Sequence, residues 1–195
     1  MISLFTTLCK IALIILSDEE IFWDGTYGYN YYSKRCPNCG AKGKLSSYGN
    51  YSRWLTFVSN KIILAKQIQP HRFKCTSCKA THALLPDIIT PNSPYSLRFK
   101  FTVLLAYYER NSTVVTICKH FGIAVSTLYE WKKLFLLHTG LLIGVHMDKK
   151  GSPLLFLRGL LDSAHLSYKL RSFFHRHKFS FMQAKSLTAP QSIPP

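Results

Sequence analysis

The sequence predicts an α+β protein in which a small β-unit with four cysteines precedes an all-helical unit. Three observations predict this architecture. Two C-x-x-C pairs bracket several short apolar runs, a proline-rich link follows the second pair, and beyond the link the apolar residues recur at helical spacing. A chain of 195 residues is long enough for two such small units.

The charge of the chain is strongly positive and unevenly distributed. The sequence has 25 Lys and Arg against 9 Asp and Glu, which gives a net charge of +16. Residues 33–98 contain eleven of the bases and a single acid, Asp87. A broad positive field suits the binding of nucleic-acid phosphates and is rarely needed by an enzyme that acts on anionic metabolites. We therefore expect a nucleic-acid partner.

The N-terminal region, residues 1–32, begins with an apolar stretch, Met1–Leu16, that Lys10 interrupts. Its longest uninterrupted apolar run, Ile11–Leu16, is far shorter than the roughly 20 residues of a membrane-spanning helix. The basic start and the small-residue cleavage site of a secretory signal are both missing. We expect one or two buried strands in this region, no membrane partner and a cytoplasmic location.

Four cysteines form the two C-x-x-C pairs: Cys36, Cys39, Cys75 and Cys78. Two intervening residues let both thiolates of a pair face one ion from a tight turn, and two such turns give the tetrahedral set that is typical of structural zinc. The next residues, Gly40 and Lys79, stand where the backbone often needs a positive φ, which glycine adopts more readily than lysine. We predict zinc as cofactor and a zinc ribbon over residues 33–90.

Other uses of four cysteines fit the sequence less well than zinc does. A thioredoxin-like redox pair needs one C-x-x-C beside a βαβ pattern, and two disulfides need an oxidising compartment. An iron–sulfur cluster also takes four cysteines, so spacing alone leaves it open. His82, four residues after Cys78, is a further candidate ligand. Since four thiolates already complete a tetrahedron, we expect His82 to be a core or surface histidine.

The long spacer between the two pairs predicts supporting strands. Apolar and aromatic residues indicate strands at Tyr51–Val58, Lys61–Gln69 and His71–Lys74. Apolar positions partly alternate along the middle strand, so we expect it to be antiparallel, with one better-buried face.

Beyond the link, residues 95–138 are expected to form three helices. The first starts after Ser96 as cap and runs to about Arg110, the second covers Thr113–His120, and the third covers Val125–Leu137. Helical spacing predicts that the following side chains face inward: Leu97, Phe101, Leu104, Leu105, Tyr108, Val114, Ile117, Cys118, Phe121, Leu128, Trp131 and Phe135.

The second and third of these helices resemble the helix-turn-helix of DNA-binding proteins over Val115–Leu134. The matching small residue, turn glycine, following apolar residue and two apolar anchors are Cys118, Gly122, Ile123, Leu128 and Trp131. The motif usually has a hydroxyl residue two positions after its glycine, where this chain has Ala124. Ser126 is the alternative cap, which would start the third helix later.

The resemblance implies double-stranded DNA as partner and the third helix as the reading element. Its exposed face, expected to reach base edges, consists of Val125, Ser126, Tyr129, Glu130 and Lys133. Phosphate contacts are expected from Lys132, Lys119 and Arg110. A plain three-helix bundle without a DNA role has the same apolar spacing and is the alternative.

A wider resemblance covers roughly residues 30–138. Cys-Pro-x-Cys-Gly, Arg-Phe-x-Cys and Thr-His-Ala-Leu-Leu-Pro stand at Cys36–Gly40, Arg72–Cys75 and Thr81–Pro86. They resemble an uncharacterised bacterial family of zinc-ribbon plus helix-turn-helix domains, a domain of unknown function. The build is also similar to the N-terminal DNA-recognition part of zinc-ribbon insertion-sequence transposases. The resemblance implies an architecture and a bacterial source rather than an activity.

Residues 139–185 are expected to be a helical extension, with one helix over Leu154–Leu170, and residues 186–195 a disordered tail. Basic and aromatic residues interleave in Arg171–Phe181, which is typical either of nucleic-acid stacking or of an amphipathic helix with core aromatics. His175 and His177 are close in sequence, but nothing nearby completes a metal-binding set.

Catalytic motifs are lacking. After the third helix the sequence offers two carboxylates, Asp148 and Asp162, where ribonuclease-H-like transposases hold two metal ions with three. No G-x-S-x-G, Walker A or dinucleotide fingerprint is present. We expect a non-enzymatic DNA-binding protein, either a transposase-like recognition module or a transcriptional regulator. A truncated or accessory part of a transposase and a zinc-ribbon protein-docking module are the alternatives, and a homo-oligomer stays open.

Overall fold

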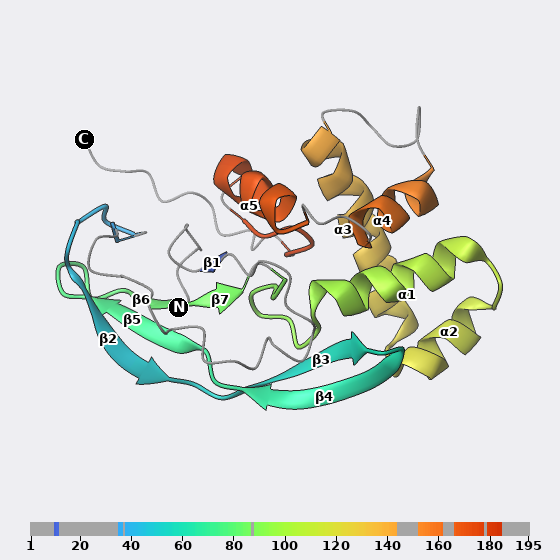
Figure 1. Cartoon of the computed structure of the whole chain (residues 1–195), viewed down its shortest axis with the longest axis horizontal. Helices are drawn as coiled ribbons and strands as arrows, with labels where there is room; N and C mark the ends of the chain where they lie inside the picture. Colours follow the sequence, from blue (N-terminus) through green and yellow to red (C-terminus); the bar gives the residue numbers. More distant parts are fainter. Residues whose placement is uncertain are drawn as a thin grey trace.

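The structure, a computed structural model, describes residues 10–11, 35–36, 38–86, 88–143, 152–161, 166–177 and 179–184. Within these ranges, small and mainly antiparallel sheets precede five helices, which confirms the predicted α+β class. Most strands, from β2 to β6, form a long curved layer along the lower side of Figure 1, and α1 and α2 lie at its right-hand end. None of the described helices is both long and apolar enough to cross a membrane.

A three-stranded antiparallel sheet lies next to the cysteines. Its strands are β2 (Leu45–Asn50), β5 (His71–Cys75) and β6 (Thr81–Ala83), with β5 in the centre. The β2–β5 register shifts between Ser47 and Asn50, where β2 contains an irregularity. The sequence predicted β5 but neither of its two neighbours.

The second sheet is a hairpin of β3 (Arg53–Ser59) and β4 (Ile62–Ile68), joined at Asn60 and Lys61. Both of these turn residues have positive φ, 47° and 66°, as a two-residue hairpin turn of the I′ type requires. The two predicted strands are confirmed to within two residues at each end.

Strand β4 is antiparallel to β3 as predicted, but the prediction that one of its faces is better buried is wrong. Of its residues only Ile68 is buried, whereas β3 supplies the fully buried Leu55 and Phe57. The reason is that β3 has a neighbour on its other edge: Thr56 donates its N–H to the carbonyl of Pro94 and accepts from the N–H of Ser96. In the described part of the chain β4 pairs with β3 alone, so most of its side chains stay in contact with solvent.

One short parallel pair joins β1 (Lys10–Ile11) to β7 (Leu85–Pro86). It is the described portion of the N-terminal region; the remaining strands predicted within residues 1–32 lie outside the described residues, as does the predicted tail 186–195.

Three helices follow, α1 (Leu97–Glu109), α2 (Val114–Phe121) and α3 (Val125–Ile143). Helix α1 is capped as predicted: the Ser96 hydroxyl accepts from the Phe99 N–H over 3.1 Å. Thr113, predicted to be the first residue of the second helix, is instead its cap, because its hydroxyl accepts from the Thr116 N–H over 3.2 Å. Helix α3 extends six residues beyond the predicted end at Leu137, because His138 and Thr139 are buried and the inward-facing stripe continues.

The C-terminal part contains two helices, α4 (Pro153–Leu161) and α5 (Leu166–His177), where the sequence predicted one over Leu154–Leu170. Leu157 is buried as expected, but Tyr168, assigned to the same apolar face, is 72% exposed. A single apolar face along Leu154–Leu170 therefore does not describe the two helices.

The aromatic residues of the C-terminal part belong to the core. Phe173, Phe174 and Phe181 are buried, and the Phe173 ring centroid lies 5.2 Å from that of Phe181 and 5.4 Å from that of His138. Of the two interpretations of Arg171–Phe181, the structure therefore supports the helix with core aromatics. Base stacking on these three rings is excluded, because other side chains already cover them.

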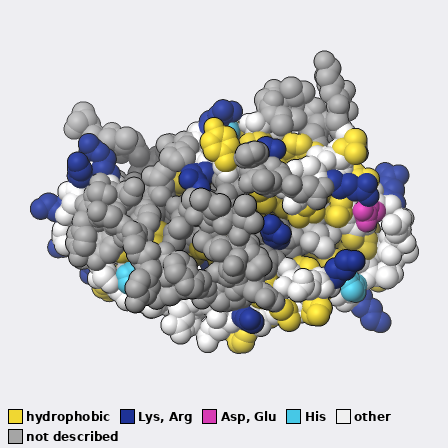
Figure 2. Space-filling view, viewed as in Figure 1, with side chains coloured by type: hydrophobic (Ala, Val, Ile, Leu, Met, Phe, Trp, Pro, Cys, Tyr) yellow, Lys and Arg dark blue, Asp and Glu magenta, His cyan; other side chains and the backbone are white. Residues whose placement is uncertain are grey.

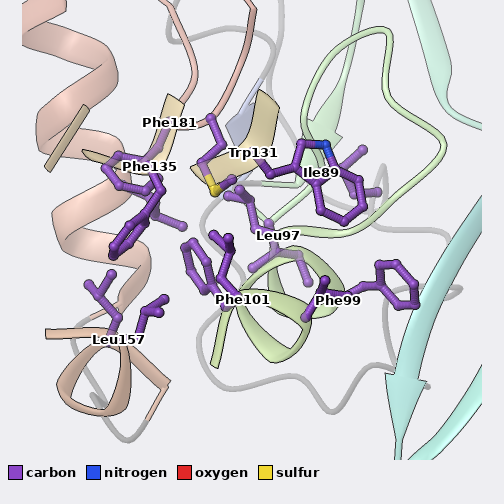
Figure 3. Close-up of a cluster of buried hydrophobic side chains, with 14 of the residues drawn as sticks. Ile89, Leu97, Phe99, Phe101, Trp131, Phe135, Leu157 and Phe181 are labelled. Atoms are coloured by element: carbon purple, nitrogen blue, oxygen red, sulfur yellow. The ribbon is translucent and has the colours of Figure 1, made fainter. Parts of the chain in front are cut away.

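The main hydrophobic core joins the helices to the hairpin. The centroid of the Phe101 ring of α1 lies 6.4 Å from that of the Phe135 ring of α3, and Figure 3 shows Leu97 of α1 and Leu157 of α4 in the same buried cluster. Leu55 and Ile68 of the hairpin belong to the same cluster. A second, much smaller cluster contains Cys36, Leu45, Phe73, Cys75 and Leu84. Among the described residues, the cysteine end of the molecule therefore has little apolar core of its own.

Candidate metal centre and exposed helix face

The structure brings the four predicted cysteines together. Their sulfur atoms all lie within 4.8 Å of one another. Cys36 Sγ is 3.6 Å from Cys78 Sγ, and Cys39 Sγ is 3.7 Å from Cys75 Sγ. All four are free thiols, of which Cys36 and Cys75 are buried and Cys39 is exposed. Each close contact joins one cysteine of the first pair to one of the second.

Both C-x-x-C turns have the same backbone geometry. In the first, the N–H of Cys36 donates to the carbonyl of Ala41 over 2.8 Å, and the N–H of Gly40 donates to the carbonyl of Cys36 over 2.9 Å. The second turn repeats both bonds at equivalent positions, which are Cys75, Lys79 and Ala80. The repeated pattern explains why two segments about 40 residues apart present their sulfurs alike.

The residue after each pair has a positive φ, as the sequence analysis expected. The angle is +73° at Gly40 and +61° at Lys79. A lysine in this left-handed conformation is strained by about 1 kcal/mol relative to glycine. The Lys79 ammonium donates to the carbonyl of Thr76 over 2.8 Å, within the same turn.

The cysteines differ strongly in acidity. Burial raises the pKa of the Cys36 thiol to about 12, although backbone N–H groups of Cys39 and Asn38 act in the opposite direction. Burial would also raise the pKa of Cys78, but the backbone N–H of Ala80 and neighbouring groups outweigh it and lower this pKa to about 6. Despite burial, which acts in the opposite direction, the pKa of Cys75 is lowered as well, by the backbone N–H groups of Cys78 and Ser77. Since metal ions bind the thiolate form, backbone N–H groups that lower these pKa values favour a role as ligands.

The sulfur spacing fits one tetrahedral metal ion. Four metal–sulfur bonds of about 2.3 Å give sulfur–sulfur edges of about 3.8 Å. The closest pairs, at 3.6 and 3.7 Å, already have this separation. A cluster with several irons places sulfides between the thiolates and needs them farther apart. The residues present can therefore hold a single ion with no open coordination position.

His82 contacts this sulfur cluster from β6. It pairs with Phe73 across the β5–β6 ladder, is 3% exposed, and places its Nε2 3.5 Å from Cys36 Sγ. Burial lowers the pKa of His82. Of the two positions expected for His82, core or surface, the structure shows the core one. Its contact with Cys36 was not predicted. The β5–β6 register would have shown it, because residue 82 lies opposite residue 73, two positions before Cys75.

Helices α2 and α3 are joined by a tight turn. Gly122 has φ +63° and donates its N–H to the carbonyls of Cys118 and Lys119, which ends α2. The next residue, Ile123, is buried against the core. The carbonyl of Ala124 accepts from the N–H of Leu128 over 3.2 Å, so α3 begins at Val125. Ser126 is therefore inside the first turn, and its alternative role as the cap is wrong.

The residues predicted to face away from the core in α3 are exposed. They are Val125, Ser126, Tyr129, Glu130 and Lys133. Arg110 after α1 and Lys119 on α2 are exposed as well. Lys132 is half-buried and turned toward α1, where its ammonium donates to the Tyr107 hydroxyl over 3.0 Å. Of the predicted phosphate contacts, Lys132 alone thus has a strong intramolecular partner among the described side chains.

Positive charge dominates the described surface. The carboxylates in the described segments are those of Glu109 and Glu130, and Glu109 forms an ion pair of 2.9 Å with Arg158. Figure 2 shows dark blue Lys and Arg side chains around the described surface and one small magenta patch at the right. Asp148 and Asp162, the carboxylates considered for catalysis, lie outside the described residues.

Two large apolar side chains of the hairpin are exposed, Trp54 at 61% and Ile62 at 60%. Trp54 is opposite Gln67 near one end of the ladder, and Ile62 is opposite Ser59 at the other. Since the intervening register puts them on opposite faces, they do not form one continuous apolar patch.

The fold and the cysteines define a small α+β protein with a candidate four-thiolate metal centre. Residues 36–131 match the model of a family described as a domain of unknown function, DUF6431. The match covers slightly less than half of the chain, from the first cysteine of the cluster to Trp131 in α3, and agrees with the expected resemblance to an uncharacterised family. No curated protein and no solved structure matches the chain.

Proposed function

We propose that this chain is a non-catalytic, zinc-stabilised protein that binds double-stranded DNA, with α2 and α3 as a helix-turn-helix. The observation that carries the proposal is the exposed face of α3 after a glycine turn. Buried Leu128, Trp131 and Phe135 fix the helix to the core, which leaves Ser126 and Tyr129 on the outside. A helix presented in this way fits the major groove.

The charge of the chain supports a polyanionic partner. The described segments contain two carboxylates, of which Glu109 forms an ion pair with Arg158 and Glu130 is exposed on α3. Three bases are exposed around the same helices: Lys119, Lys133 and Arg110. Each phosphate contact by such a base releases condensed counterions, which supplies affinity for any duplex sequence.

Zinc is the metal we propose for the cysteine cluster. Four thiolates at tetrahedral spacing suit zinc, and a closed set without an open position stabilises the fold rather than performing chemistry. A single iron would use the same four ligands. Metal analysis of protein purified without added metal distinguishes the two: about one zinc per chain supports the proposal, and iron would contradict it.

The proposal covers two roles, a transposase-like recognition module and a transcriptional regulator. The alternative is a truncated or accessory part of a transposase. The scarcity of carboxylates after α3 supports a non-catalytic role. A metal-dependent cleavage assay on plasmid DNA addresses this point. Cleavage that disappears in Asp148→Asn or Asp162→Asn would show that the chain is an enzyme.

The decisive experiment measures binding to a fluorescent duplex by anisotropy. We expect affinity to fall steeply between about 50 and 200 mM salt, and a random duplex pool to yield a preferred sequence. Ser126→Ala and Tyr129→Ala should alter that preference, because these side chains are placed for base edges. Absence of binding at low salt would refute the DNA-binding proposal.

A protein-docking module is the second candidate function. The exposed Trp54 and Ile62 favour it, because such large apolar side chains are common at interfaces. Their positions on opposite faces of the hairpin weaken it. Sedimentation of the wild type and of Trp54→Ser tests self-association: a dimer that dissociates on this substitution would support docking between copies of the chain.

A further inference from the structure

We propose that His82 is a positioning residue of the metal centre, whose Nε2–H donates a hydrogen bond to the Cys36 thiolate. The inference rests on the proposed metal site and adds a residue to it. His82 Nε2 is 3.5 Å from Cys36 Sγ, a distance suited to a hydrogen bond with the large sulfur atom. Both side chains are almost completely buried, at 3% and 2% exposure, so water does not compete for either atom.

The β5–β6 ladder fixes this contact. His82 pairs with Phe73, and Phe73 lies two residues before Cys75 in β5. Because side chains alternate across a strand, Phe73, Cys75 and His82 all lie on the face that carries the sulfur cluster. The position of the imidazole is thus fixed by a regular strand pair rather than by a loop.

The surroundings of the ring decide which nitrogen carries the proton. Nδ1 of His82 is buried and has no hydrogen-bond partner among the described residues. A metal-bound Cys36 is a thiolate and accepts only, so the one N–H of a neutral imidazole is best used on Nε2. The opposite tautomer would leave a buried N–H unpaired and place two lone pairs against each other, which costs more.

Cys36 is the thiolate that needs such a donor. Four thiolates around a divalent ion leave two net negative charges, which are costly to bury. Water can solvate the exposed Cys39, but it cannot reach Cys36. Backbone N–H groups of Cys39 and Asn38 already donate to the Cys36 sulfur, and His82 adds a side-chain donor.

Cobalt(II) binding to the full chain tests the inference. We expect His82→Phe, which keeps a ring but removes the donor, to weaken cobalt affinity by about 10- to 100-fold. The sulfur-to-cobalt charge-transfer band should keep its four-thiolate intensity and shift in energy, because Cys36 loses its hydrogen bond. A merely structural role would lower stability without shifting the band.

Three variants make the test decisive. His82→Gln can return an N–H to the position of Nε2 and should restore affinity and band position, whereas His82→Asn is too short to reach Cys36. This pair decides the question even if His82→Phe does not fold. His71→Gln is the matched control, because His71 bonds Ser47 and Asn50 rather than a sulfur.

Unchanged affinity and an unchanged band in both His82→Phe and His82→Asn would overturn the inference while leaving the metal site intact. A wild-type cobalt spectrum with the signature of a nitrogen ligand that is lost in His82→Phe would also overturn the inference, since His82 would then bind the metal itself. A wild type that takes up neither cobalt nor zinc would refute the metal centre, and the inference with it.

Discussion

The Lys132 ammonium of α3 donates a hydrogen bond to the Tyr107 hydroxyl of α1 over 3.0 Å and lies 5.1 Å from the centre of its ring. Its neighbour Lys133 is exposed, and the structure shows no partner for its ammonium among the described residues. The sequence predicted DNA contacts for both of these adjacent lysines, but only the ammonium of Lys132 has an intramolecular partner among the described residues. Lys132 supports the packing of α3 on α1, and Lys133 is available to a ligand.

Lys133 lies at the end of the face expected to reach base edges, and because its ammonium is exposed it can also contact a phosphate. Lys133→Ala should therefore weaken binding to any duplex and reduce the salt dependence of log Kd by about one unit, because that phosphate contact is lost. Its thermal stability should equal that of the wild type. Lys132→Ala should lower the melting temperature as well as the affinity, since it also removes the contact with Tyr107. Anisotropy titrations at several salt concentrations and thermal melts measure both effects.

Two controls accompany this experiment. Lys169→Ala removes an exposed lysine on α5 and should leave the salt dependence unchanged. Tyr107→Phe removes the hydroxyl and should destabilise the protein without reducing the number of phosphate contacts. Equal losses of affinity for Lys133→Ala and Lys169→Ala would indicate that only the net charge matters.

Removal of the metal should unfold one end of the molecule rather than all of it. The sheet of β2, β5 and β6 rests on the small cluster around Phe73 and the cysteines, whereas Leu55 and Ile68 anchor the hairpin in the large helical core. After chelation, amide protons of β5 should exchange rapidly, while those of β3 and α1 stay protected. Hydrogen exchange measured by mass spectrometry resolves these segments.

The matched pair for metal removal is Cys75→Ser and Cys118→Ser. Cys75→Ser should abolish metal binding and reproduce the exchange pattern of the chelated protein. Cys118 is buried in the helical core, so Cys118→Ser should keep the metal and lower only the stability. Loss of protection in α1 on chelation would show that the two ends unfold together, contrary to this prediction.

Gly122→Ala should destabilise the protein by about 1 kcal/mol. Gly122 has φ +63°, and a Cβ built there meets no atom within 4 Å, so the cost comes from the backbone alone. Gly159 in α4 has equally open surroundings but no positive φ, and Gly159→Ala should stabilise by about 0.5–1 kcal/mol. Urea unfolding of both variants measures the difference. A neutral Gly122→Ala would mean that the turn rearranges.

The helices were largely predictable because their ends are encoded locally. Ser96 and Thr113 cap α1 and α2 with their own hydroxyls, and Gly122 ends α2. The flanking strands of the cysteine sheet were not predictable. β6 has three residues, and β2 contains a register shift, so neither carries a clear alternation of apolar residues.

In the candidate site, too, features set within one turn were predictable from the sequence, whereas contacts between residues far apart in the sequence were not. The C-x-x-C spacing predicted the four cysteines, because each pair acts within a single turn. The contact of His82 with Cys36 depends on strand pairing, and that of Lys132 with Tyr107 on the packing of two helices. Neither contact leaves a pattern in sequence, since the partners are 46 and 25 residues apart.

Stability should fall as the pH is lowered from about 6.5 toward 4, because of His138 on α3. Burial lowers the pKa of His138 to about 4 from the usual 6.5, with smaller contributions from the positive charges of His177 and Lys100. In this range the unfolded chain binds the proton and the folded one does not, so protonation favours unfolding by up to about 3 kcal/mol. Protonation of Nδ1 would also break the hydrogen bond that it accepts from the Met182 N–H over 2.8 Å.

His138→Gln keeps a polar side chain without a titrating group, so its urea midpoint should change less than that of the wild type between pH 7 and pH 4.5. Parallel midpoint curves for the two proteins would show that His138 does not set the acid limit of the fold.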